Sequence, residues 1–213
     1  MEINAPYIRI VGCGPGSLEH FTASAIDAVA QAGLLVGAER LLALFPDHPA
    51  KRISVGADID SVLDEIGTYL GHLRIVVLVT GDPGLCSLAQ PVIKHFGREA
   101  CEVIPGISSI QVAFARMGLD WLNARVIDAH SGVPRIDPLS LAGEEKIAVL
   151  PGHSASKAWV IDLIRTVSHT HRVYICQDLT LENEHIRRIE SHEKGTMDFS
   201  LRTILLCIKE GVL

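Results

Sequence analysis

Hydrophobic residues in the first half of the chain form short continuous runs that alternate with helix-spaced sets. The clearest run is Ile75–Val79, five β-branched or leucine residues that predict a strand buried on both faces. The clearest helical set lies in Asp58–Leu70, where apolar side chains recur on one face. Strands that alternate with helices indicate a parallel sheet covered by helices. The other elements predicted here are strands at Tyr7–Cys13, Leu34–Val36 and Cys101–Ile104, and helices at Thr22–Ala32, Glu39–Leu44, Ser87–Phe96 and Ile107–Met117.

The second half follows a break at Met117–Trp121, where Gly118 and Asp120 end the last helix and indicate a domain junction. Because strands outnumber helices beyond this point, the second sheet should be mixed rather than purely parallel. The sequence therefore predicts an α/β protein with two domains, residues 1–118 and 122–213. The elements predicted in the second are strands at Ala124–Asp128, Ile147–Leu150, Arg172–Cys176, Ile186–Ile189 and Thr203–Ile208, and a helix at Ser154–Thr166.

Three glycine-bearing turns, Gly12–Gly16, Thr80–Gly84 and Pro105–Ser109, each follow a predicted strand of the first half. Glycine permits tight turns and a close backbone approach to a ligand, and open α/β sheets bind ligands at the carboxyl ends of their strands. Asp82 is costly at the end of a buried strand unless ligand hydroxyls or backbone amides satisfy it. Ser108 and Ser109 lie at a helix N-terminus, where they could cap the helix or bind a ligand. Together the turns predict a small-molecule site.

The first turn invites a dinucleotide-binding interpretation, which its spacing disfavours. The fingerprint G-x-G-x-x-G requires glycine where this chain has Ser17, and Pro15 removes an amide donor. Glu39, the candidate ribose-binding acid, lies farther along than the expected ~20 residues. The turn is therefore either a tight structural turn or a substrate-facing loop.

Composition and charge narrow the classes of partner. The formal net charge of −6 argues against a general nucleic-acid binder, which needs a basic surface. No apolar run approaches the ~20 residues that span a bilayer, and Met1–Asn4 lacks the basic and apolar regions of a signal peptide. We therefore expect a cytoplasmic protein that binds neither nucleic acid nor membrane.

The cysteines and histidines predict no metal centre. The five cysteines are scattered, without a Cys-x-x-Cys pair, and are interpreted as small buried hydrophobic residues. His169 and His171 have ligand-like spacing, but no third ligand lies at the spacing of a metal site. The chain also lacks the G-x-S-x-G sequence of a nucleophile elbow. The candidate chemistry therefore depends on the glycine turns.

In order and spacing, Val11–Gly16, Thr80–Gly84 and Ile104–Ser109 resemble the tetrapyrrole methylase family, and the resemblance covers essentially the whole chain. It implies two α/β domains, with the methyl donor S-adenosylmethionine held in the cleft between them. Ile104–Trp121 is similar to the branch that methylates carbon 5 of a corrin precursor in cobalamin synthesis. The later Gln177–Ile186 is similar to the second-domain pattern of that branch.

The resemblance also implies roles for individual residues. The first turn is expected to face the tetrapyrrole, through Gly12, Gly14, Pro15 and Gly16. Many members carry Asp after Gly-Pro-Gly, whereas this chain has Ser17, so no catalytic base is assigned. The residues implied for the donor are Gly81, Asp82, Leu85, Ser108, Ser109, Leu150, Pro151, Gln177 and Leu206. The candidates for binding the carboxylates of the macrocycle are Arg40, Arg52, Arg116, Arg125 and Arg135.

The partners implied by the resemblance are a precorrin substrate and a second copy of the chain in a homodimer. Some members are fused to an enzyme that decarboxylates and methylates carbon 15, for which 213 residues leave no room. That activity is expected on a separate polypeptide or outside this sequence. Three alternatives remain: a relative that acts on another ring position or substrate, a non-catalytic nucleotide-binding module, and a nicotinamide oxidoreductase.

Overall fold

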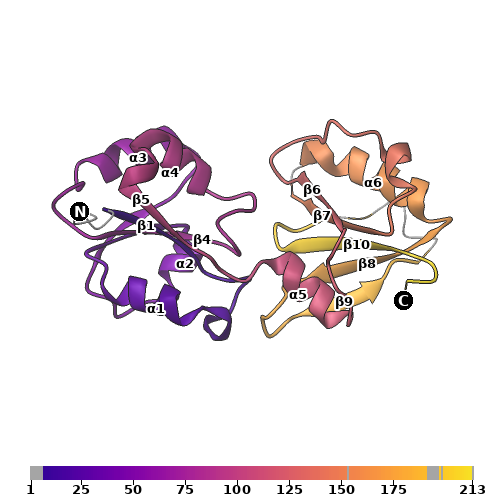
Figure 1. The fold of residues 1–213 in the computed structure, drawn as a ribbon, viewed down its shortest axis with the longest axis horizontal. Coiled ribbons are helices and arrows are strands. Elements are labelled where there is room, and N and C mark those ends of the chain that lie inside the picture. Colours follow the sequence, from indigo (N-terminus) through magenta and orange to yellow (C-terminus); the bar gives the residue numbers. More distant parts are fainter. Residues whose placement is uncertain (1–6, 153, 191–196, 198, 213) are drawn as a thin grey trace. The chain divides into compact units, whose positions relative to one another are not determined.

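The computed structural model describes residues 7–152, 154–190, 197 and 199–212. The chain folds into two compact units, Met1–Ser108 and Ser109–Leu213. Each unit contains one five-stranded sheet with helices packed on it (Figure 1). None of the helices in the described ranges is long and apolar enough to cross a membrane.

The N-terminal unit is built on a sheet with strand order β3-β2-β4-β1-β5. Every neighbouring pair runs parallel, which confirms the predicted parallel sheet. The strands are β1 Ile8–Gly12, β2 Leu34–Gly37, β3 Lys51–Ser54, β4 Ile75–Val79 and β5 Cys101–Ile104. The helices are η1 Leu18–His20, α1 Ala23–Ala30, α2 Glu39–Leu42, α3 Ile59–Gly67, α4 Ala89–Phe96 and η2 Arg98–Ala100.

The parallel sheet is buried on both faces because successive strand residues point to opposite sides. In β4, Ile75, Val77 and Val79 pack into one core with residues of α3 and α4. Val76 and Leu78 pack into a second core with residues of α1 and α2. Figure 1 shows α3 and α4 on one side of the sheet and α1 on the other. All of β4 is at most 4% exposed, so the prediction of a doubly buried strand is confirmed.

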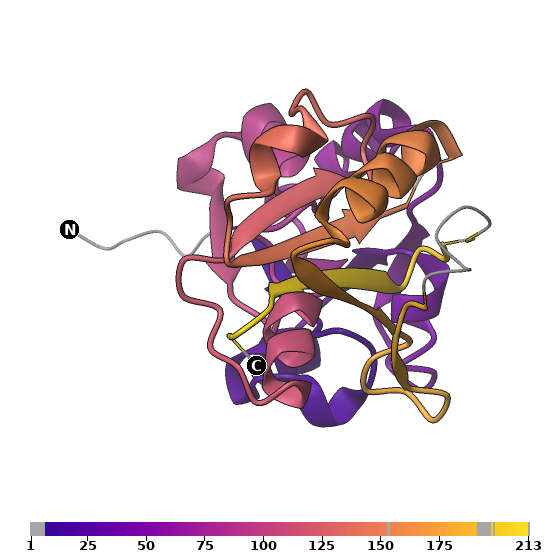
Figure 2. The same ribbon diagram turned by 90° about the vertical axis from the view of Figure 1, so that its right-hand side faces the viewer.

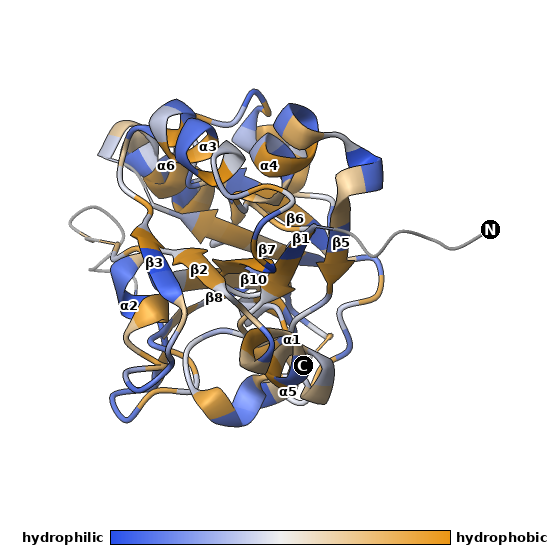
Figure 3. Ribbon diagram, turned by 90° about the vertical axis from the view of Figure 1, so that its left-hand side faces the viewer, coloured by the Kyte–Doolittle hydropathy of each residue, from blue (hydrophilic) through white to orange (hydrophobic). Residues whose placement is uncertain are grey.

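The edge strand β3 is absent from the elements expected on sequence grounds. Its residues Lys51, Arg52 and Ser54 are exposed, and only Ile53 is buried. Figure 3 shows this strand in the blue of hydrophilic residues, unlike its orange neighbour β2. A polar strand on the edge of a sheet discourages pairing with other chains. The same polarity removes the hydrophobic run by which the other strands are recognised.

The C-terminal unit contains the mixed sheet that the sequence predicts. Its strand order is β6-β7-β10-β8-β9, with β6 and β7 parallel and the remaining pairs antiparallel (Figure 2). The strands are β6 Arg125–Ala129, β7 Lys146–Pro151, β8 His171–Gln177, β9 His185–Arg188 and β10 Thr203–Lys209. The helices are α5 Ser109–Arg116, η3 Pro138–Leu141, η4 Ser154–Ser156 and α6 Lys157–Val167.

Helix α5 packs against the central strand β10 of the second sheet, with Ile110, Ala113 and Phe114 buried. Helix α6 packs its apolar residues into a core built on the same sheet. The boundary expected at residue 118 places α5 in the first domain, whereas the division in the structure falls after Ser108. The difference has a physical cause, since the apolar face of α5 is buried on β10 rather than on the parallel sheet.

An ion pair joins a buried lysine to an exposed aspartate in the C-terminal unit. The Lys146 ammonium on β7 lies 2.7 Å from Asp120 Oδ1 and donates to the Asp120 carbonyl at 3.1 Å. The lysine side chain is 7% exposed and the aspartate 71%. The hydrogen bond from Lys146 lowers the pKa of the Asp120 carboxyl below its usual range. Because the Lys146 side chain is buried, loss of this carboxylate would leave its charge uncompensated.

The Lys146–Asp120 pair predicts a loss of stability in acid. A carboxyl whose pKa is lowered by folding stabilises the native state above its usual pKa of about 3.9 and ceases to do so as pH falls through the folded value. We therefore expect Asp120→Asn to be less stable than the wild type at pH 7. Below about pH 4 the two should converge. Urea titrations across this pH range measure the difference, and a constant gap would contradict the assignment.

Candidate functional site

The glycine turns meet at the carboxyl ends of β1, β4 and β5, which are neighbours in the parallel sheet. Gly81 donates from its N–H to the Gly14 carbonyl at 2.7 Å, and Gly14 returns a bond to the Gly81 carbonyl at 3.2 Å. Just before them, the Cys13 N–H donates to the Val79 carbonyl at 2.8 Å. The first two turns are therefore joined backbone to backbone, in continuation of the strands that they follow.

The turns approach one another so closely that only glycine fits. A Cβ placed on Gly106 would lie 2.4 Å from the Gly81 carbonyl oxygen, and one on Gly12 would lie 2.6 Å from the Gly106 nitrogen. Gly14 and Gly81 also have φ angles of 69° and 66°, in the left-handed region that glycine adopts readily. Glycine is thus required here by contact as well as by backbone conformation.

Asp82 ties the second turn to the third. Its Oδ1 accepts from the Gly84 N–H at 2.8 Å, and its Oδ2 accepts from the Gly106 N–H at 3.1 Å. The sequence left open whether ligand hydroxyls or backbone amides satisfy this half-buried carboxylate, and backbone amides do so. We call Gly12, Gly14, Gly81, Asp82 and Gly106 the turn junction. The other residues of these turns differ in exposure: Pro15 and Ser108 are buried, and Gly16 and Leu85 are half-buried.

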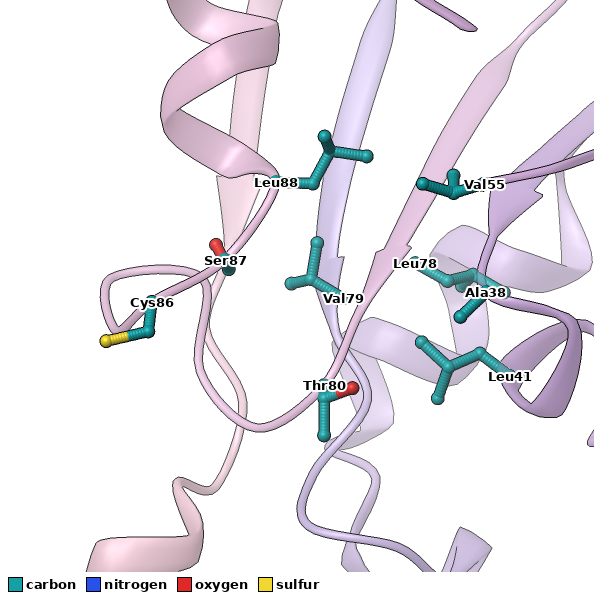
Figure 4. A pocket seen from close by; sticks show the side chains of 9 residues that line it. All are labelled: Ala38, Leu41, Val55, Leu78, Val79, Thr80, Cys86, Ser87 and Leu88. Atoms are coloured by element: carbon teal, nitrogen blue, oxygen red, sulfur yellow. The ribbon is translucent and has the colours of Figure 1, made fainter. Parts of the chain in front are cut away.

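A cavity of about 160 Å³ opens beside the turn junction (Figure 4). Its walls come from the ends of β2, β3 and β4 and from the loop that leads into α4. Most of its side chains are apolar, with the Thr80 and Ser87 hydroxyls and the Cys86 thiol as the exceptions. The residues that line it are Ala38, Leu41, Val55, Leu78, Val79, Thr80, Cys86, Ser87 and Leu88. The sequence predicted a pocket at these strand ends without identifying this wall.

Of the candidate arginines in the N-terminal unit, Arg40 lies at the site and Arg52 does not. Arg40, on α2, donates from Nη2 to the Thr80 hydroxyl in the second turn. Burial raises the pKa of the Cys13 thiol in the first turn to about 12, and the charge of Arg40 opposes that rise. Arg52 instead donates to backbone carbonyls after α2, at 3.0 Å to Pro46. Arg40 therefore contacts the second turn, and its charge acts on the first.

Some of the donor-binding residues expected in the C-terminal unit share one sheet edge. Leu150 and Pro151 end β7, and Gln177 ends β8 opposite Thr203, the first residue of the intervening strand β10. The Gln177 amide donates to the Thr203 hydroxyl at 3.4 Å. Leu206 differs from these residues, because it is fully buried in the middle of β10. Arg125 and Arg135 are exposed on this unit.

Arg116 holds a loop of its own unit. Its Nε and Nη2 donate to the two carboxylate oxygens of Glu184 at 2.6 and 3.1 Å, and this pairing raises the pKa of the guanidinium. Glu184 Oε2 also accepts from the Thr180 N–H at 2.7 Å. The guanidinium expected to bind a substrate carboxylate is thus engaged by a carboxylate of the chain.

The loop that pairs with Arg116 contains two left-handed residues within three positions after Gln177. Asp178 has φ 49° and Thr180 has φ 71°, and such conformations in residues other than glycine store strain and cluster at functional sites. Arg202 Nε lies 2.5 Å from Asp178 Oδ1, which fixes the loop at its other end. The sequence indicates this segment only through the resemblance, because its left-handed positions hold Asp178 and Thr180 rather than glycine.

The interpretation of all five cysteines as buried hydrophobic residues is wrong for Cys86. Its side chain is exposed, and its φ of 47° turns the chain beside the cavity. By contrast, burial raises the pKa of Cys176 and Cys207 to about 12, as it does for Cys13. Cys101 is half-buried. In the part of the chain that the structure describes, no three His, Cys, Asp or Glu residues gather as a metal site.

The sequence matches a known family and is similar to individual proteins of known name. Residues 8–193 match the family described as Tetrapyrrole (Corrin/Porphyrin) Methylases. The probable cobalt-precorrin-7 C(5)-methyltransferase of Methanocaldococcus jannaschii is 32% identical over 96% of this chain and 98% of its own length. The cobalt-precorrin-7 C(5)-methyltransferase of Salmonella typhimurium is 30% identical over 84% of this chain and 88% of its own length.

A solved structure shares the fold. The uroporphyrin-III C-methyl transferase from Thermus thermophilus, complexed with S-adenyl homocysteine, superposes with a TM-score of 0.75 at 19% identity. The superposition covers 94% of this chain and 96% of that chain. This likeness, together with the two sheets, confirms the α/β fold class expected from the sequence.

Proposed function

Because this chain belongs to the tetrapyrrole (corrin/porphyrin) methylases, we propose that it transfers a methyl group from S-adenosylmethionine to carbon 5 of cobalt-precorrin-7. The observation that carries the proposal is the 32% identity to a named relative over nearly the full length of both chains. The names of the relatives favour the cobalt-containing substrate, which the sequence alone left open. The three turns at the strand ends support the same proposal, since glycine permits a ligand to approach the backbone closely.

The residues of the N-terminal unit fit a methyl donor of this kind. Bound S-adenosylmethionine supplies a methyl group on a sulfonium sulfur, a good leaving group. The chain needs no nucleophile of its own, because the electron-rich macrocycle provides one. Its task is to align the two reactants and to exclude water. The turn junction gives a rigid backbone surface for alignment, and the apolar side chains of the cavity, such as Leu41, Val55 and Leu78, exclude water.

Methyl transfer itself is the direct test. The purified chain is incubated with S-adenosylmethionine labelled in the methyl group and with cobalt-precorrin-7, and the new methyl is located by NMR. We expect label on carbon 5, with the metal-free precorrin as the weaker acceptor. Donor binding without transfer to either acceptor would favour the alternative of a non-catalytic nucleotide-binding module. Label on another ring carbon would favour a different member of the family.

The sequence and its resemblance support three further proposals. We propose that the chain acts in the cytoplasm, that it forms a homodimer, and that carbon 15 is methylated by a separate polypeptide or by a segment outside this sequence. A sedimentation run tests the homodimer, since a dimer has twice the 23.0 kDa mass of the chain. A single species at the monomer mass would overturn it.

Asp82→Ala is expected to weaken donor binding by about tenfold while the protein stays folded. Two hydrogen bonds to a charged group are lost, each worth about 1.5–3 kcal/mol. The second turn is then no longer held to the third, and only part of the lost free energy appears as weaker donor binding. Calorimetry with S-adenosylhomocysteine measures the affinity. Asp27→Ala, at an exposed aspartate of α1, is the matched control. Equal affinity in both variants would remove Asp82 from the site.

Cys86 is expected to report occupancy of the cavity. In the folded protein a thiol reagent should modify exposed Cys86 first and half-buried Cys101 more slowly, while Cys13, Cys176 and Cys207 react only after unfolding. Because Cys86 lines the cavity, S-adenosylhomocysteine should slow its modification by about tenfold or more at saturation. Mass spectrometry of digests gives the rate at each cysteine. A rate at Cys86 that ignores the ligand would place the donor elsewhere.

A further inference from the structure

A second and larger cavity lies in the N-terminal unit, at the amino-terminal ends of strands β1 and β4. Its volume is about 330 Å³, within the usual range for small-molecule sites. It is lined in part by Arg9, the second residue of β1, and by Arg74, which directly precedes β4. The turn junction follows the opposite ends of the same two strands. This cavity therefore shares no residue with the proposed donor site.

Two guanidinium groups converge in this cavity on a single neutral acceptor. Arg9 Nη1 donates to the Gln31 side-chain oxygen at 3.3 Å, and Arg74 Nη1 donates to the same oxygen at 3.2 Å. Glu102 on β5 balances one charge, with Oε2 at 2.9 Å from Arg9 Nε. Across the described residues, Arg74 has no carboxylate partner. Two like charges held close together repel each other unless an anion neutralises them.

The contacts described above leave further N–H donors of both guanidinium groups available to an anion. Each guanidinium carries five N–H donors in a planar fork that matches carboxylate and phosphate oxygens. The contacts to Gln31 and Glu102 use Nε and Nη1 of Arg9 and Nη1 of Arg74. His72 and Tyr7 add a ring nitrogen and a phenol to the same lining. Gln31 fixes the two forks relative to each other, which reduces the entropy lost on binding.

We propose that this cavity binds a small oxyanion, the phosphate or carboxylate group of a metabolite, independently of methyl transfer. The formal net charge of −6 makes the pair of arginines in one cavity informative, because acidic residues outnumber basic ones in the chain as a whole. The ligand bridges Arg9 and Arg74 and replaces the missing counterion. A site of this kind couples the stability of the N-terminal unit to the concentration of the anion.

Thermal unfolding and calorimetry of the full chain test the site, with inorganic phosphate and succinate as probes and sodium chloride at matched ionic strength as the reference. We expect at least one oxyanion to raise Tm above the chloride value. Arg74→Gln and Gln31→Ala should each weaken its binding by tenfold or more. Arg98→Gln, at an exposed arginine of the same unit outside the cavity, is the matched control and should bind like the wild type.

The two probes distinguish the sources of the ligand. Binding of phosphate alone assigns a phosphorylated metabolite, and binding of succinate alone assigns a carboxylate. Two results would overturn the proposal: a Tm that follows ionic strength alone, or an Arg74→Gln variant that binds as tightly as Arg98→Gln. Neither result bears on methyl transfer, which is measured separately.

Discussion

Gly106→Ala should abolish methyl transfer and destabilise the N-terminal unit by about 1–3 kcal/mol, the usual cost of forcing extra volume into a packed site. The added Cβ would lie 2.4 Å from the Gly81 carbonyl oxygen and 2.7 Å from the backbone of Gly12. The three nearest atoms are all backbone, so no side-chain rotation relieves these contacts. The third turn must therefore shift. This shift moves the Gly106 N–H, which donates a hydrogen bond to the Asp82 carboxylate.

Gly56→Ala is the matched control for this substitution. A Cβ on Gly56 meets nothing within 4 Å, and its backbone needs no left-handed φ. Urea titrations give the free energy of unfolding of both variants, and labelled S-adenosylmethionine gives the rate of transfer. If Gly106→Ala were as stable and as active as Gly56→Ala, the close approach of the turns would be needed neither for stability nor for methyl transfer.

The turn junction separates what a sequence can predict from what it cannot. The hydrophobic run Ile75–Val79 and the glycines after three strands predict a parallel sheet with a ligand site at its carboxyl edge. They do not predict that the glycines pack against one another, because that contact depends on the strand order β4-β1-β5. The structure thereby gives these glycines a packing role next to the expected one of backbone exposure.

Contacts between distant residues account for the other differences. Arg116 and Glu184 are 68 residues apart, and nothing local marks their pairing. Cys86 is exposed and has a left-handed φ where it lines the cavity, in a segment whose neighbouring residues indicate burial. Strand β3 lacks a hydrophobic signal because it lies at an edge. In each case the local residue pattern is weak and the tertiary environment decides.

Arg40→Gln should raise the KM for the precorrin by about 10–100-fold, the range that corresponds to one charge-assisted hydrogen bond of about 1.5–3 kcal/mol. Arg40 contacts Thr80 and lies near Cys13, so its charge stands between the first two turns. Among the candidate arginines, Arg52 and Arg116 contact groups away from the turns, and Arg125 and Arg135 are exposed on the other unit, whereas Arg40 contacts the second turn. The peripheral carboxylates of the macrocycle are the anions that this charge suits.

The affinity for S-adenosylhomocysteine decides which reactant Arg40 serves. We expect it to change less than twofold in Arg40→Gln, because in the proposed function the donor contacts the backbone of the turns rather than this side chain. Arg40→Lys should recover only part of the KM, since an ammonium lacks the planar fork that pairs with a carboxylate. Arg98→Gln, at an exposed arginine away from the turns, should retain the wild-type KM. An unchanged KM together with weakened S-adenosylhomocysteine binding would show that Arg40 binds the methyl donor and not the precorrin.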